Sequence, residues 1–185
     1  MASARNRAIW LAVIAAVIIS DQLTKWLILN EPAFNAINCL PDRSQCGKIE
    51  ISSVFDLTML WNFGISFGTL QSDGLMRWVL VLVTTGIAAA FGYWLLRAER
   101  WLTSLSLALV IGGAIGNLID RIRFGAVVDF LDFSGPWFGA YIGNWPVGFP
   151  WVFNIADAGI TVGAVLLFFD QFLMSRNETG DATGV

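Results

Sequence analysis

Four long apolar stretches, separated by more polar segments, dominate the pattern of this chain. They run over residues 9–29, 78–96, 102–119 and 151–169. Each has roughly the 20 mostly apolar residues that a helix needs to cross a bilayer. The second and third contain no charged residue, the first contains Asp21 and Lys25, and the fourth contains Asp157. The pattern predicts an all-α integral membrane protein with four transmembrane helices.

The composition agrees with this pattern and restricts the chemistry. Of the 185 residues, 56% are hydrophobic and only 14% are charged, which is typical of membrane proteins. The basic residues are scattered, so we expect no nucleic-acid partner. Histidine is absent and there are two cysteines, which excludes Ser-His-Asp triads, Cys-His pairs and the usual zinc sites. We therefore expect no metal and no cofactor.

Four crossings place both termini on one side of the membrane. Total Lys and Arg counts do not decide which side, but basic residues close to helix ends carry most weight. Arg5 and Arg7 precede the first stretch, and Arg97 and Arg100 crowd the short connector between the second and third. Both termini are therefore expected in the cytoplasm. The expected layout is one domain over residues 1–176, with outer segments 30–77 and 120–150 and a polar cytoplasmic tail over 177–185. The chain after Met174 is expected to be disordered.

The first outer segment combines an alternating pattern with two cysteines. Residues 49–61 alternate raggedly between apolar and polar side chains, which predicts strands of a half-buried sheet. Two strands alone are marginal in water, so the sheet is expected to rest on the membrane surface or on the helices. Cys39 and Cys46 form a disulfide if this side is oxidising, although two free cysteines fit the sequence equally well.

Two aspartates stand beside the predicted helices at a similar depth. Asp129 follows an apolar run just outside the third helix, and Asp157 lies near the outer start of the fourth. A loop position would explain the first alone, and a helix dipole the second, but their common depth favours a pair. Two close carboxylates share a proton and can hydrolyse an amide without metal or cofactor. Asp170, at the other end of the fourth helix, needs no special role.

Other polar residues accompany this pair. Asp21 and Lys25 are four residues apart on one helical face, which predicts a buried ion pair that fixes helix packing. Gly64 permits a positive φ or the close approach of a ligand, and the amide of Asn62 can donate to a substrate carbonyl. A plain turn is the competing interpretation of that string.

The end of the third helix joins small residues to polar ones. Gly112 and Gly116 are four residues apart, the spacing of close helix contacts in membranes. Packing does not explain Asn117, Asp120 and Arg121, which follow at helical spacing. A guanidinium at this position pairs with an acid such as Asp120 or binds a lipid phosphate.

Taken together, these strings form five ordered motifs. They are Asp21-Gln22-x-Thr24-Lys25, Asn62-x-Gly64 with Phe67, Gly116-Asn117-x-x-Asp120-Arg121, Val128-Asp129-Phe130 and Phe153-Asn154-x-Ala156-Asp157. Over essentially its whole length the chain thereby resembles lipoprotein signal peptidase, or signal peptidase II, the membrane aspartic peptidase of bacteria. The resemblance implies four transmembrane helices with a small periplasmic β-cradle and a short periplasmic helix. It also implies a multi-pass protein of the bacterial inner membrane with its active site near the periplasmic face.

The resemblance further implies an activity and a set of site residues. The family removes the signal peptide from membrane-bound prolipoproteins just before a cysteine that carries diacylglycerol, and the cyclic peptide globomycin inhibits it. Membrane lipids are the other expected partners. The family's catalytic pair falls on Asp129 and Asp157. The supporting residues fall on Asn62, Gly64, Asn117, Arg121 and Asn154, with Asp21, Lys25 and Asp120 as structural polar residues. Residues 133–150 are long and aromatic-rich against the family pattern, and form either a flap or a membrane-resting loop.

Two other functions compete with the peptidase. A proton- or ion-coupled transporter would use Asp21, Asp129 and Asp157 as a relay, but a relay needs acids spread through the bilayer depth. Internal repeats, which are common in transporters, are not visible either. The second competitor is a non-enzymatic assembly factor whose polar residues only hold helices together.

Overall fold

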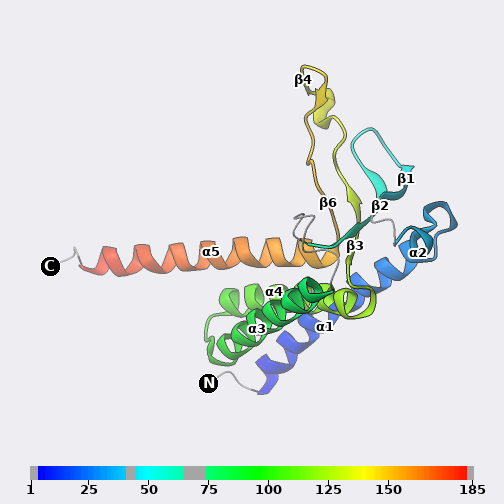
Figure 1. Cartoon of the computed structure of the whole chain (residues 1–185). Coiled ribbons are helices and arrows are strands. Elements are labelled where there is room, and N and C mark those ends of the chain that lie inside the picture. The colour runs from blue at the N-terminus through cyan, green and yellow to red at the C-terminus, as the bar shows by residue number, and fades with distance from the viewer. Residues whose placement is uncertain (1–3, 41–44, 65–73, 183–185) are drawn as a thin grey trace.

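A computed structural model of the chain describes residues 4–40, 45–64 and 74–182. Its long helices are α1 (Ala4–Leu29), α3 (Leu75–Arg97), α4 (Trp101–Phe124) and α5 (Ile155–Ala182). Its shorter elements are η1 (Pro32–Phe34), α2 (Ala36–Cys39), β1 (Gln45–Glu50), β2 (Asp56–Asn62), β3 (Val127–Asp132), η2 (Trp137–Gly139), β4 (Tyr141–Ile142), β5 (Trp145–Pro146) and β6 (Val152–Phe153). All four long helices are long and apolar enough to span a membrane, which confirms the predicted helical architecture. Both termini lie at the end of the helices away from the sheet (Figure 1).

Helix α4 is the centre of the bundle and packs against the other three long helices. In its candidate membrane span 67% of the residues are buried, against 6% in α3. Small residues allow this contact, because a Cβ on Gly112 would press against Val17 of α1 and one on Gly113 would overlap the carbonyl of Ala156 in α5. The predicted close helix contacts along this face are confirmed.

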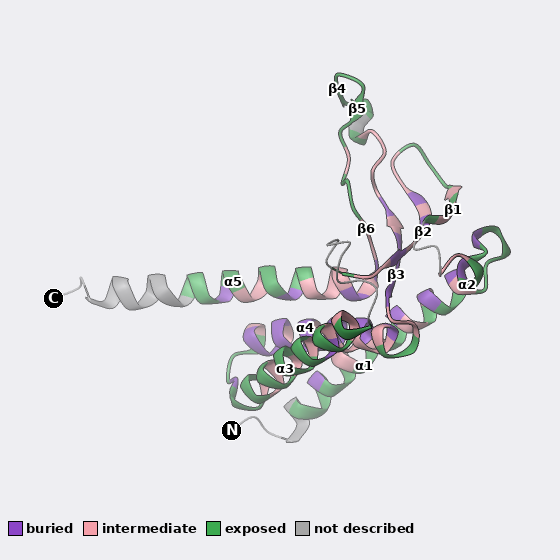
Figure 2. Ribbon diagram, viewed as in Figure 1, coloured by how far each residue is buried: buried purple, intermediate pink, exposed green. Residues whose placement is uncertain are grey.

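The outer faces of the other helices are apolar. Leu11 of α1, Leu82 of α3 and Phe168 of α5 are 66%, 71% and 70% exposed, and exposed residues line the length of α3 (Figure 2). In water such surfaces would be unfavourable, whereas lipid tails accept them. These faces are therefore the ones that contact the bilayer.

The helix ends differ from the predicted ones in two places. Helix α4 continues beyond residue 119 to Phe124, so Asp120 and Arg121 belong to the helix. Helix α5 begins at Ile155, later than expected, and continues to Ala182. Helix α5 thus includes residues 175–182, where the sequence predicted a disordered tail; extending an existing helix costs much less than starting one. Residues 183–185 lie outside the described residues.

The small sheet has four antiparallel strands in the order β1-β2-β3-β6. Strands β1 and β2 confirm the prediction over residues 49–61, but β3 and β6 were not predicted. The two residues of β6 are too few to show alternation, and β3 is buried on both faces, so neither carries a period-two pattern. Met59, Trp61 and Val128 of the sheet form one core with Ile28 and Phe34. The sheet therefore rests on the end of α1 and on η1, one of the two supports expected.

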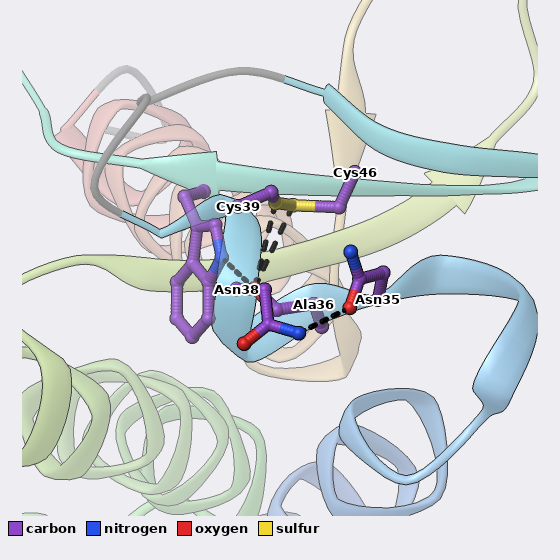
Figure 3. Close-up of a disulfide and its surroundings, with 6 residues drawn as sticks. Asn35, Ala36, Asn38, Cys39 and Cys46 are labelled. Atoms are coloured by element: carbon purple, nitrogen blue, oxygen red, sulfur yellow. Dashed lines mark hydrogen bonds between the residues drawn. A yellow bond between two sulfur atoms is a disulfide. The ribbon is translucent and has the colours of Figure 1, made fainter.

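A disulfide between Cys39 and Cys46 ties α2 to β1, with 5.7 Å between the two Cα atoms (Figure 3). Of the two possibilities that the sequence left open, the structure has the bonded one. The carbonyl oxygen of Ala36 lies beside both sulfurs and accepts a hydrogen bond from the indole N–H of Trp61 at 2.9 Å. These contacts hold the short helix against the sheet.

Asp170 has a structural role that the sequence analysis missed. Its side chain is fully buried, pairs with Arg100 at 2.8 Å and accepts a hydrogen bond from the hydroxyl of Thr103. The acid near the end of the membrane-spanning part of α5 is thereby joined to the start of α4. An unpaired carboxylate at this depth would be costly, so the pair fixes how the two helices lie together.

Adding one methyl group at Gly113 tests the packing of α4 on α5. We expect Gly113→Ala to lower the thermal unfolding midpoint in detergent, because overpacking typically costs about 1–3 kcal/mol. Gly86→Ala in α3 is the matched control, since a Cβ there meets no atom within 4 Å. Equal midpoints for the two variants would contradict the close contact.

Candidate active site

The carboxylates of Asp129 and Asp157 come from different elements and line the same cavity. Asp129 lies in β3 and is almost fully buried, whereas Asp157 lies in the first turn of α5 and is half-buried. The cavity has a volume of about 810 Å³ and also touches Asn62 and aromatic side chains of residues 133–153. Its remaining wall is the apolar side of α5, at Ala158 and Val162. The two predicted acids thus face one space large enough for a peptide segment.

Asn154 connects the two acids. Its side-chain N–H donates to Asp129 at 2.7 Å, and its side-chain oxygen accepts from the backbone N–H of Asp157 at 2.9 Å. In return, the carboxylate of Asp157 accepts from the backbone N–H of Asn154 at 3.3 Å. This reciprocal pair is a capping box, which satisfies N–H groups that a helix start leaves free. The cap of α5 therefore sets the position of both carboxylates.

Asn117 of α4 holds Asp157 from the other side. Its side-chain N–H donates to the carboxylate at 2.7 Å, while its oxygen accepts from Lys25 at 3.1 Å and from Asn154 at 3.2 Å. Because the oxygen faces two donors, the amide can present only its N–H group to Asp157. The orientation of this acid is thereby fixed.

Asn62 of β2 holds Asp129 in the same manner. Its side-chain N–H donates to the carboxylate at 2.9 Å, and its oxygen accepts from the backbone N–H of Gly64 at 2.8 Å. Gly64 has φ 89°, a conformation that other residues rarely adopt. The positive φ that the sequence suggested for Gly64 is present, and it lets the backbone N–H of Gly64 orient the side chain of Asn62. Phe67, the remaining residue of this motif, lies outside the described residues.

The surroundings of Asp129 favour its protonated form. Burial, followed by the nearby charge of Asp157, raises the pKa of Asp129 from its usual 3.8 to about 7. The hydrogen bonds from Asn62 and Asn154 act in the opposite direction and do not compensate. Near neutral pH this acid can therefore hold a proton.

Asp132 shows that this shift is not a general property of strand β3. Burial would raise its pKa as well, but hydrogen bonds from Ser134 and Thr58, together with the charge of Lys48, lower it below the usual value. Thr58 donates at 2.6 Å, and the Lys48 ammonium lies 3.7 Å away. The pKa values of two acids three residues apart are thus shifted in opposite directions. Burial and the charge of Asp157 outweigh the hydrogen bonds at Asp129, whereas the hydrogen bonds and Lys48 outweigh burial at Asp132.

Beneath the two acids, Lys25 pairs with two further carboxylates. Its ammonium lies 2.8 Å from both Asp21 and Asp120, and all three side chains are buried. Asp21 also accepts the backbone N–H of Ala156 in α5 at 2.9 Å, and Asp120 accepts that of Val128 in β3 at 3.1 Å. The ion pair predicted between Asp21 and Lys25 is present. The structure adds Asp120 and connects the cluster to both elements that carry the acids of the cavity.

Comparison with known proteins decides the family. The family model described as "Signal peptidase (SPase) II" matches residues 13–173. The chain belongs to the signal peptidase II family. The lipoprotein signal peptidase of Caulobacter vibrioides is 37% identical over 173 residues, which cover 93% of this chain and 91% of that protein. That of Burkholderia mallei is 41% identical over 170 residues, which cover 90% and 89%.

Solved structures show the same fold. A bacterial membrane enzyme determined by the in meso method at 2.3 Å resolution superposes with a TM-score of 0.67 at 25% identity. The match covers 92% of this chain and 91% of that one. Membership of the signal peptidase II family makes the chain a peptidase and a multi-pass membrane protein, in agreement with its four apolar helices.

Arg121 of this signal peptidase does not use Asp120, one of the partners considered for it. Its anticipated partner Asp120 pairs with Lys25 instead, and Arg121 has no carboxylate oxygen within 4.0 Å in the described part of the chain. Its charge nevertheless lies close enough to Asp157 and Asp129 to interact with both. Its buried Nε has no hydrogen-bond partner among the described residues. A buried donor near the paired acids is thus left without a partner in the described part of the chain.

Gln22 is the supporting side chain whose role the sequence did not reveal. Its amide N–H donates to Asp21 at 3.1 Å, to Asp120 at 3.0 Å and to the carbonyl of Gly116 at 3.2 Å. The first motif contains Gln22, but the sequence assigned no role to it. By contrast, Asn154 followed three residues later by Asp157 resembles a capping box and was a readable signal.

No metal site accompanies these groups in the described residues. There, no cluster of three or more Cys, Asp or Glu side chains is arranged to hold an ion. The carboxylates beneath the cavity are instead neutralised by Lys25. The described groups can hold and transfer protons and can donate hydrogen bonds, which suits acid–base hydrolysis.

Replacing Lys25 tests whether it supports the site. Lys25→Met leaves two buried carboxylates without a counter-charge, and breaking a buried pair costs about 3–5 kcal/mol. We expect a large loss of folded protein and a lower unfolding midpoint in detergent. Lys48→Met is the matched control, because Lys48 lies 2.7 Å from Asp56 but is 37% exposed. Exposed pairs contribute only about 0–1 kcal/mol, so a comparable loss there would contradict the argument.

Proposed function

We propose that Asp129 and Asp157 are the catalytic pair with which this signal peptidase removes signal peptides from prolipoproteins. The observation that carries the proposal is that the two carboxylates line one cavity and are joined through Asn154. The relatives named lipoprotein signal peptidase supply the substrate class. The bond cleaved is the one just before the cysteine that carries diacylglycerol.

The two acids take different roles. Asp129 carries the shared proton, in keeping with its raised pKa of about 7. Asp157 is the base: it accepts hydrogen bonds from Asn117 and from the backbone of Asn154, as an ionised carboxylate does. It also stands at the N-terminal end of a long helix, where negative charge is favoured.

Hydrolysis then proceeds without a covalent intermediate. Asp157 takes a proton from a water molecule, and the resulting hydroxide oxygen attacks the scissile carbonyl carbon. Asp129 donates its proton to the carbonyl oxygen as the tetrahedral intermediate forms. The proton on Asp157 passes to the amide nitrogen, the C–N bond breaks, and the carbonyl oxygen returns a proton to Asp129. One water is consumed, and both acids end in their starting states.

Neighbouring donors position the substrate. Asn62 lines the cavity and can donate to a backbone carbonyl of the bound peptide, while the positive charge of Arg121 acts on both acids from nearby. The apolar wall of the cavity, including Phe153 and Val162, suits the apolar side chains of a signal peptide. Globomycin-type inhibitors are expected to occupy the same cavity and contact both acids.

The chain is placed in the bacterial inner membrane with the sheet and the cavity on the periplasmic side. Two features support this orientation. The disulfide between Cys39 and Cys46 lies at the sheet end, and disulfides persist in the oxidising periplasm. Arg97 and Arg100 flank the connector at the opposite end, as expected of a cytoplasmic loop. Both termini are then cytoplasmic.

The competing functions receive less support. A proton relay needs acids at several depths, whereas Asp21, Asp120, Asp129 and Asp157 all gather around one network at the sheet end. An assembly factor would use polar groups to hold helices together, but it has no use for an acid with a raised pKa beside an open cavity.

Removing either acid tests the catalytic pair. We expect Asp129→Asn and Asp157→Asn each to lower the rate of cleavage of a diacylglyceryl-modified prolipoprotein in liposomes by about 100- to 10,000-fold, because each loses a proton-transfer group. Asp132→Asn is the control, since it removes a carboxylate from the same strand outside the cavity, and it should cleave normally. Normal cleavage by either of the first two variants, with folding verified, would show that the pair is wrongly assigned.

The pH dependence provides a separate test. Asp129 must be protonated to act as the acid, so activity should be retained up to about pH 7 and then fall as this group ionises. Because Asn62 donates to the ionised form, Asn62→Ala should raise the pKa of Asp129 further and move the alkaline limb to higher pH. Initial rates across the alkaline range measure this limb. Asn38→Ala, which removes an amide far from the cavity, should leave it in place, and a shift of the Asn62 variant to lower pH would refute the assignment.

A further inference from the structure

Residues 133–153 form an excursion between β3 and α5, which we call the aromatic hairpin. Its outer part consists of η2, β4 and β5, with a two-residue turn at Gly143 and Asn144. The segment contains no charged residue, but it includes three tryptophans, one tyrosine and four phenylalanines. By contrast, the hairpin of β1 and β2 carries Lys48, Glu50 and Asp56.

The tip of the aromatic hairpin exposes large apolar side chains. Ile142 is 75% exposed and Trp145, directly opposite it in the register, is 79% exposed. Tyr141 on the other face is 59% exposed, and Trp151 at the base is 67% exposed. Figure 2 shows the whole tip as exposed. Contiguous apolar surface of this kind marks an interaction site.

The aromatic hairpin is an ordered element with its own hydrogen bonds. The backbone N–H of Trp137 donates to the carbonyl of Val147 at 2.9 Å, and the N–H of Val147 donates to that of Ala140 at 3.0 Å. The indole N–H of Trp137 donates to the carbonyl of Phe133 at 2.8 Å. Gly143 has φ 63°, as the first position of a type II′ hairpin turn requires. The exposed tip is therefore held in a defined place.

The aromatic hairpin runs in the direction expected of a segment that lies along the membrane surface. In Figure 1 the aromatic hairpin leaves the sheet end of the bundle and runs sideways from α5 instead of continuing along its axis. The membrane-spanning part of α5 begins at Ile155, next to the base of the hairpin. A segment that leaves a transmembrane helix sideways at its end lies at the depth of the lipid headgroups.

We propose that the tip of the aromatic hairpin, residues 141–146, docks into the interfacial layer of the lipid bilayer beside α5. The occupant is lipid because the hairpin adjoins the start of α5, a helix whose apolar side chains are exposed along its membrane-spanning part, with Val162 and Phe168 50% and 70% exposed. Tryptophan and tyrosine favour this layer, where the ring meets acyl chains and the polar atom meets water. The absence of charge avoids the cost of burying ions there.

Docking also bears on the cavity. Trp137 and Phe149, in the stem of the aromatic hairpin, line the cavity that holds Asp129 and Asp157. A tip fixed in the bilayer surface therefore holds one wall of this cavity at the depth of the lipid headgroups. The docking itself does not depend on the proposed catalysis, so its failure would leave the catalytic pair untouched.

Fluorescence of Trp145 in the full-length protein tests the docking. Wild type and Trp145→Phe are reconstituted in phosphatidylcholine liposomes, and the difference between their emission spectra isolates Trp145. We expect this signal to be blue-shifted from that of tryptophan in water. It should lose most of its intensity when the liposomes contain phosphatidylcholine brominated near the headgroup end of the acyl chains, and little when acrylamide is added to the water.

Trp26→Phe provides the positive control, because Trp26 is 56% exposed on the membrane-spanning part of α1. Its difference signal should also be quenched by brominated lipid. A Trp145 signal at the wavelength of water, quenched by acrylamide but not by brominated lipid, would place the tip in solution and overturn the proposal. A blue-shifted signal that neither quencher reaches would indicate a protein contact and would overturn it equally.

Discussion

The ammonium of Lys25 lies between the carboxylates of Asp21 and Asp120, and the rest of the site depends on this buried cluster. Each carboxylate also accepts a backbone N–H of a second element, Asp21 that of Ala156 in α5 and Asp120 that of Val128 in β3. Three charges in an apolar bundle are tolerated only when each is paired and hydrogen-bonded. The pairing requirement therefore fixes where a helix and a strand, remote in sequence, meet.

Above this cluster, amide side chains orient the two acids without adding charge. Asn117 and Asn154 each face one acid with a donor, and their remaining atoms are engaged by Lys25 or by the helix cap. Neutral donors position a carboxylate but stabilise its charge less than a cation does. At Asp129, burial and the nearby charge of Asp157 outweigh these hydrogen bonds and keep the pKa raised. At Asp132, hydrogen bonds from Ser134 and Thr58, together with the charge of Lys48, outweigh burial and lower the pKa.

On the surface of the molecule, too, apolar and charged side chains occupy different regions. The helices turn apolar side chains outward, while the charged groups lie inside the bundle, on the hairpin of β1 and β2, or at helix ends, as Arg97 and Arg100 do. Close packing around α4 relies on glycines, because helices in lipid associate through shape and hydrogen bonds and not through water exclusion. The aromatic hairpin extends the apolar surface sideways, next to the cavity.

Hydropathy by itself determined the four long helices, because burial in lipid is a local property of each stretch and is visible in the residues alone. The sequence also identified Asp129 and Asp157 as unusual, since a carboxylate beside an apolar span needs an explanation. Only the tertiary structure decided that Asp120 pairs with Lys25, that Gln22 bridges the two aspartates of that cluster, and that β3 and β6 complete the sheet. These features join residues far apart along the chain, and the physical reason is that such partners are selected by packing and by charge neutralisation in three dimensions, which no local pattern records.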